Sequence, residues 1–144
     1  MKAIEYLSRI RKLNDQINRK IRTAEHWKEM AYNISVEYKD DGGRKSPSNN
    51  APFEKCIERA DELEREITAD IDRLADLKIE AEEKIGLIED DVGQEILRLR
   101  YVKLMLWEDV MDMIDRSRSQ MFKRHKKAIH QLEKILENET MVRL

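Results

Sequence analysis

Two long runs of apolar residues with a seven-residue period constrain the fold of this 144-residue chain more than any other feature. A seven-residue period keeps apolar side chains on one face of a helix, where a partner helix can cover them. We therefore expect two long coiled-coil helices. The first run is Ala3, Ile10, Ile17, Ala24, Ala31 and Tyr38, accompanied by Leu7, Leu13, Ile21, Trp27 and Ile34. The second is Phe53, Ala60, Ile67, Leu74, Ala81 and Ile88, accompanied by Ile57, Leu63, Ile71, Leu77 and Ile85.

Residues 40–52 separate the two runs and read as a loop. This segment holds two of the four glycines and both prolines of the chain, among polar residues that favour turns. Because the flanking runs have matched lengths, we expect an antiparallel hairpin over residues 1–91. One hairpin seam leaves apolar surface uncovered, so we also expect self-association, as a homodimer, through this region.

The remaining residues predict three shorter helices, at 92–104, 107–114 and 118–137, followed by a tail at 138–144. Ser117 is a suitable N-cap for the third of these helices, and Gln120 stands at the position that a capping box requires. A short helix, a tight turn at 115–117 and a longer helix form a helix-turn-helix. The predicted fold class is therefore all-α: a long coiled-coil hairpin followed by a small three-helix domain at 92–137.

Charge is distributed unevenly along the chain. Residues 53–91 carry 15 acidic and 6 basic side chains, whereas residues 116–144 carry 3 acidic and 8 basic ones. A basic segment that begins at a capped helix suits the phosphates of nucleic acid, although a charged run by itself is usually only a solvated face. The last helix should turn Met121, Ala128, Leu132 and Ile135 inward and place its basic residues on the opposite face.

We accordingly expect the start of the last helix to contact double-stranded DNA, since a recognition helix enters the major groove by its N-terminal turns. Arg118, Ser119, Phe122 and Lys123 should meet base edges, while Arg124, Lys126 and Lys127 should lie nearer phosphates. The predicted DNA-binding residues are Arg116, Ser117, Arg118, Ser119, Gln120, Phe122, Lys123, Arg124, Lys126 and Lys127.

Several residues in register between about 92 and 135 carry a family resemblance. The segments RYVKL (100–104), WEDV (107–110) and SRSQM (117–121) are followed by Arg124, Lys127, Ala128 and Leu132. This order resembles the fourth region of bacterial sigma factors, which commonly reads RY, aromatic-EEIA and S-x-S-T-V. Leu104 and Leu106 stand where that family prefers a glycine and a polar helix-starting residue. The upstream 91 residues have no promoter-melting region, which excludes a complete sigma factor.

A long heptad-bearing segment before such a region resembles small phage and prophage proteins of Gram-positive bacteria. This resemblance implies a transcriptional regulator that acts with the host RNA polymerase. A phage DNA-packaging protein of the small-terminase type is the main alternative within DNA binding. A coiled-coil interaction protein, such as an anti-sigma factor, is the alternative from another class. Salt-sensitive binding to duplex DNA would distinguish the last alternative.

Other functions find little support in the sequence. Phosphate-binding loops, dinucleotide fingerprints and nucleophile motifs are missing, so we predict neither an enzyme nor a cofactor. His125 and His130 are five residues apart, which does not suit a shared metal ion on a helix. A single cysteine, Cys56, cannot form an internal disulfide, and no apolar stretch has the length of a signal peptide or membrane span. We therefore expect a cytoplasmic protein.

Overall fold

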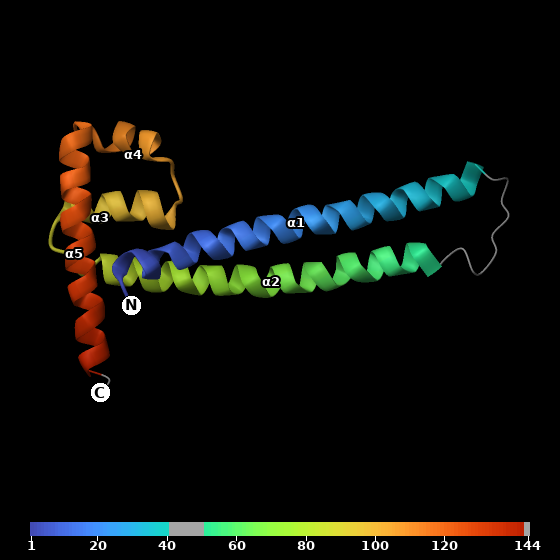
Figure 1. Cartoon of the computed structure of the whole chain (residues 1–144), viewed down its shortest axis with the longest axis horizontal. Coiled ribbons are helices and arrows are strands. Elements are labelled where there is room, and N and C mark those ends of the chain that lie inside the picture. Colours follow the sequence, from blue (N-terminus) through green and yellow to red (C-terminus); the bar gives the residue numbers. More distant parts are fainter. Residues whose placement is uncertain (41–50, 143–144) are drawn as a thin grey trace. The chain divides into compact units, whose positions relative to one another are not determined.

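A computed structural model describes residues 1–40 and 51–142, and its elements within these ranges are all helical (Figure 1). The elements are α1 (Ala3–Asp40), α2 (Ala51–Ile85), α3 (Asp91–Leu97), the π-helical turn η2 (Arg98–Val102), α4 (Trp107–Ile114) and α5 (Arg118–Val142). The all-α fold, with a long helical hairpin before smaller helices, is confirmed. None of the described helices is long and apolar enough to cross a membrane.

Several of the expected boundaries change, and the helix expected at 92–104 is α3 followed by the π-helical turn η2. Residues 51 and 52, expected in the loop, are the first residues of α2, and residue 40 ends α1. The rest of the expected loop, and the side chain of Tyr38, lie outside the described residues. Residues 138–142, expected as a tail, instead continue α5, since nothing in this polar stretch stops a helix.

Helices α1 and α2 contribute to two compact units, residues 14–73 and residues 1–13 with 74–144. In the first unit Lys20 pairs with Asp70, and Lys28 pairs with Glu64. Partner numbers on α2 fall as numbers on α1 rise, as an antiparallel pair requires. Among the described residues of this unit, the buried side chains are Ile17, Ala24, Ala31, Cys56, Ala60, Leu63 and Asp70.

The seam of this unit differs from the expected one at two places: Cys56 is buried where Ile57 was expected, and one layer is polar. Ile21 and Ile71 were expected to pack inward, but both are exposed, Ile71 by 49%. Their neighbours Lys20 and Asp70 occupy the seam instead, with the ammonium nitrogen 2.7 Å from a carboxylate oxygen. Lys20 is seven residues after Leu13 and Asp70 seven after Leu63, so the strict period assigns these places to the polar pair.

The second unit has a core to which the start of α1, the end of α2, α3, η2 and α5 all contribute. Ala3, Leu7 and Ile10 belong to the same buried cluster as Leu97 and Leu132. We expected separate regions at 1–91 and 92–137, but the first turns of α1 share a core with the C-terminal helices. A broad apolar face at the base of the hairpin is thereby covered by more than one partner helix.

The chain reverses direction between η2 and α4 at a strained residue. Leu104 has a φ of 58°, in the left-handed region that favours glycine, and its side chain packs at the edge of the core. The Arg100 guanidinium donates to the Met105 carbonyl at 2.9 Å, which satisfies the backbone just after this residue. The place where the resembled family prefers glycine is thus one that requires a positive φ.

Candidate nucleic-acid interface

Helices α4 and α5 are joined by a turn of three residues, 115–117. Asp115 ends α4 in the left-handed conformation, with a φ of 53° and a ψ of 47°, and its N–H donates to the Met111 carbonyl at 3.2 Å. Ser117 then caps α5, because its hydroxyl accepts the N–H of Gln120 at 3.2 Å. The predicted cap is confirmed, and α4 and α5 begin at the predicted residues.

A small apolar cluster holds α4 and α5 together. Ile96, Leu99, Val110 and Met121 are fully buried in it. Ala128 and Leu132, further along α5, are buried in the larger core. The inward face of α5 is therefore occupied along most of its length, as expected, and this fixes which face remains available to a ligand.

Four aromatic rings close the edge of this cluster. Trp107 lies 5.0 Å from Phe122 and 4.9 Å from His125 between ring centroids, and Tyr101 stacks on His125. The Tyr101 hydroxyl and Nε2 of His125 share a hydrogen bond of 2.7 Å. Burial, together with the positive charge of Arg100, lowers the pKa of His125, which favours the neutral ring.

Eight of the ten predicted DNA-binding residues are exposed on the turn and the first turns of α5. Arg118 lies over the Phe122 ring at 5.6 Å. Within residues 1–40 and 51–142, the five basic members form no ion pair with an acidic side chain, so their charges are not neutralised locally. The eight residues are Arg116, Ser117, Arg118, Ser119, Gln120, Lys123, Lys126 and Lys127.

The other two predicted residues, Phe122 and Arg124, are engaged inside the protein. Phe122 is half-buried against Trp107, so the expectation that it faces outward is wrong. Nη1 of Arg124 donates to both carboxylate oxygens of Asp90, at 2.9 and 3.0 Å. A helical projection of α5 alone cannot show either contact, because Trp107 belongs to α4 and Asp90 is the N-cap of α3.

Asp90 is the residue of this region that the DNA-binding expectation did not include. It is the N-cap of α3, and its carboxylate accepts the Val92 N–H at 3.2 Å. Burial would raise the pKa of Asp90, but the hydrogen bond and charge of Arg124, with the backbone N–H groups of Val92 and Gly93, hold that pKa below its usual value. In the sequence, the three adjacent acids at 89–91 indicate the start of a helix but not this ion pair.

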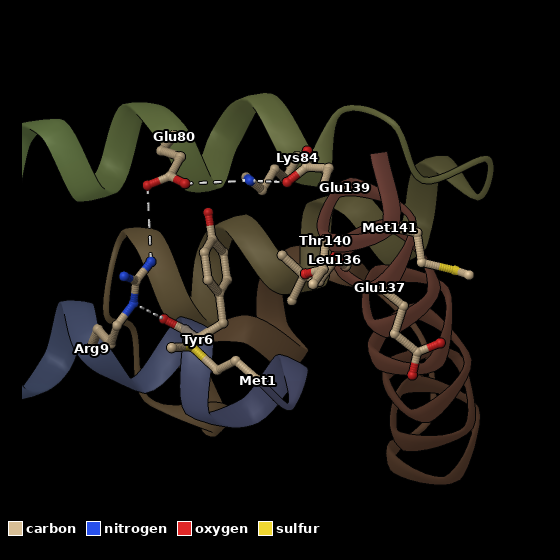
Figure 2. Close-up of a pocket in the computed structure, with 10 residues that line it drawn as sticks. All are labelled: Met1, Tyr6, Arg9, Glu80, Lys84, Leu136, Glu137, Glu139, Thr140 and Met141. Carbon is tan, nitrogen blue, oxygen red and sulfur yellow. Dashed lines mark hydrogen bonds and ion pairs between the residues drawn. The ribbon is translucent and has the colours of Figure 1, made fainter. Parts of the chain in front are cut away.

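A separate hollow lies where the start of α1, the end of α2 and the end of α5 meet (Figure 2). Its volume is about 540 Å³. Tyr6 is its most buried member, at 5% exposure, and its hydroxyl has no hydrogen-bond partner within residues 1–40 and 51–142. One wall is a chain of alternating charges, Arg9 to Glu80 to Lys84 to Glu139. These charges largely neutralise each other, so the hollow has no clear preference for one sign of ligand.

A comparison with protein families matches residues 30–133 to the family described as proteins of unknown function, DUF1492. The chain belongs to this family. No curated protein and no solved structure matches it. The DUF1492 match includes all of α4, the turn at 115–117 and α5 as far as Glu133, and so it includes both the exposed basic residues and the Asp90–Arg124 pair.

Proposed function

We propose that the chain is a sequence-specific, non-enzymatic DNA-binding regulator of transcription that reads duplex DNA with the first turns of α5. The observation that supports this most is the combination of a capped helix, a tight turn and a short bracing helix with basic side chains that form no ion pair with the described residues. Arg118, Lys123 and Lys127 are exposed, while the opposite face of α5 is buried. A surface of unpaired cations on a preformed helix is suited to phosphates and base edges.

The exposed residues divide by their position along α5. Arg118, Ser119 and Lys123 lie in the first turns, which enter a groove, and are proposed to meet base edges. Lys126 and Lys127 follow one turn later and are proposed to meet phosphates, together with Arg116 in the turn before the helix. Phe122 packs behind these residues against Trp107 and is not proposed as a base contact.

Two substitutions test this division. Arg118→Ala should weaken binding to a selected site by about 1–3 kcal/mol and relax the preference at one base pair. Lys127→Ala should weaken binding to all duplexes alike and reduce the dependence of log affinity on log salt by about one. Lys55→Ala removes an exposed charge from α2 and serves as the control. Electrophoretic titrations across salt concentrations would measure all three.

The proposal has a clear contrary outcome. If the wild-type protein bound no duplex from a random library at low salt, the regulator function would be wrong, and a coiled-coil interaction protein would be the better interpretation. If Arg118→Ala weakened selected and random duplexes equally, α5 would be an electrostatic contact without sequence readout. A packaging protein would bind specifically but would not change transcription from a template carrying the selected site.

The same proposal includes two protein partners. The resemblance to sigma region four in a phage or prophage setting supports action with the host RNA polymerase. Exposed Ile21 and Ile71, next to the polar layer of the hairpin, support a homodimer through the unit at residues 14–73. A monomeric mass in sedimentation at high micromolar concentration would rule out the homodimer and any palindromic site that depends on it.

A further inference from the structure

Arg124 carries a guanidinium group that could bind a phosphate, but in this structure the group is paired with a carboxylate of the protein itself. Its guanidinium is directed at Asp90, whose side chain is only 16% exposed, whereas the Arg124 side chain is 41% exposed. Asp90 holds this position independently, because it also caps α3 through the Val92 N–H. The ion pair therefore joins the recognition helix to the first turn of α3 at a rigid, half-buried point.

A second ion pair fixes α5 near its other end. Lys84 of α2, whose side chain is mostly buried, pairs with Glu139 (Figure 2). About four helical turns separate Arg124 from Glu139 along α5. Between these two points Ala128 and Leu132 are buried in the core. The back of α5 is thus held by an ion pair at each end of a packed segment, and its first turns extend beyond the Arg124 contact.

Position on the helix gives the same assignment. Arg124 precedes Ala128 by four residues and follows Met121 by three, so it lies beside the buried stripe. Lys123 and Lys126, its near neighbours in sequence, are exposed. A rotation of α5 about its own axis would be opposed first by the Arg124 pair, since this is the polar contact nearest to the proposed reading turns.

We infer that Arg124 is a positioning residue: through Asp90 it sets the rotation and direction of the first turns of α5, and it does not contact DNA phosphate. The inference rests on the proposed DNA-binding function, and it replaces the phosphate contact predicted for this arginine from the sequence. Loss of the pair should affect discrimination between DNA sequences, because base contacts depend on the orientation of the helix. Attraction to phosphate should change little, since the exposed cations at the start of α5 remain.

The experiment compares Asp90→Asn with Arg124→Gln, using a duplex selected from a random library by the wild-type protein and a scrambled duplex of equal length. Asparagine retains the N-cap of α3 while removing the charge of the ion pair. Both variants should lose about tenfold in affinity for the selected duplex, the size of effect of a mismatched base pair. Affinity for the scrambled duplex should change much less, slightly upward for Asp90→Asn, which leaves Arg124 as an additional unpaired cation, and slightly downward for Arg124→Gln. The double variant should lose no more than either single variant.

Arg124→Lys and Lys127→Ala complete the set. Lysine keeps the charge, but its ammonium nitrogen ends one atom short of Nη1, the arginine nitrogen that donates to Asp90. A positioning role therefore predicts that Arg124→Lys resembles Arg124→Gln, and a phosphate contact predicts that it resembles the wild type. Helix content and the unfolding midpoint of each variant show whether it is folded at the assay temperature. Lys127→Ala is the reference variant, because the loss of a phosphate contact should reduce the dependence of log affinity on log salt.

The outcomes separate the two proposals. If Arg124→Gln flattened the salt dependence as Lys127→Ala does, while Asp90→Asn left binding unchanged, Arg124 would be a phosphate contact and the positioning role would be wrong. The DNA-binding function would then stand. If the wild type bound neither duplex, the function itself would fail, and the positioning role with it.

Discussion

Gly93 of α3 lies against Ala128 of α5, and this close approach should make Gly93→Ala destabilising. A Cβ atom built on Gly93 would lie 3.0 Å from the Cβ of Ala128 and 3.3 Å from a carboxylate oxygen of Asp90. Ala128 has no rotamer to change and is buried, so relief requires the two helices to separate. That movement would also lengthen the contact between Asp90 and Arg124.

The expected magnitude combines two opposing effects. Alanine is more favourable than glycine by about 1 kcal/mol in a helix interior and by less in the first turn, where Gly93 lies. This effect would stabilise the variant by at most about 1 kcal/mol if space were available. Forcing an additional methyl group into a packed contact costs about 1–3 kcal/mol. We expect the steric cost to exceed the helix gain, for a net loss of about 1 kcal/mol, because both atoms in contact belong to helices and neither is the end of a flexible side chain.

A double-mutant cycle with Ala128→Gly isolates the contact. Ala128→Gly alone should cost about 1 kcal/mol through helix propensity. The double variant Gly93→Ala/Ala128→Gly exchanges the two residues and should return to near wild-type stability, which gives a coupling energy of about 2 kcal/mol. Urea denaturation followed by circular dichroism measures each free energy of unfolding. A Gly93→Ala variant more stable than the wild type, with additive single effects, would refute the close approach.

Three further predictions concern stability. Leu104→Gly should be more stable than Leu104→Ala by about 1 kcal/mol in urea denaturation, because only glycine adopts the positive φ without strain; equal stabilities would contradict the strain. The pKa of His125 is lower in the folded chain than in the unfolded chain, so the unfolded chain binds a proton at His125 at a higher pH than the folded chain does. The free energy of unfolding should therefore fall as the pH drops below about 6.5. Denaturation at two pH values should show this fall in the wild type and not in His125→Gln. Lys20→Met should lower the free energy of unfolding by about 3 kcal/mol, since among the described residues it leaves buried Asp70 with the solvent-exposed Arg73 at 3.4 Å as its remaining ion-pair partner. Adding Asp70→Leu should recover most of this loss. An unchanged thermal midpoint for Lys20→Met would count against the buried pair.

The sequence predicts the helices well because their signals are local. A seven-residue period identifies α1 and α2, and the Ser117 cap identifies the start of α5. The polar layer of the hairpin was missed because hydrophobicity favours Ile21 and Ile71 over their charged neighbours. Strict spacing from Leu13 and Leu63 would have placed Lys20 and Asp70 in the seam, and their opposite charges would have supported that register.

The candidate interface is harder to predict from the sequence than the helices are. A helical projection shows on which face of α5 a side chain lies, but not which residues of other helices lie opposite that face. Phe122 borders the buried stripe of α5, and whether it faces water depends on Trp107, whose place is set by the turn at Leu104. Arg124 depends similarly on Asp90, 34 residues earlier in the chain. Both side chains suit DNA by type, and both are engaged by other helices. Among the described residues, Arg118 and Lys123 form no ion pair with another helix, whereas Arg124 pairs with Asp90. The proposed readout of base edges is therefore assigned to Arg118 and Lys123 and not to Arg124.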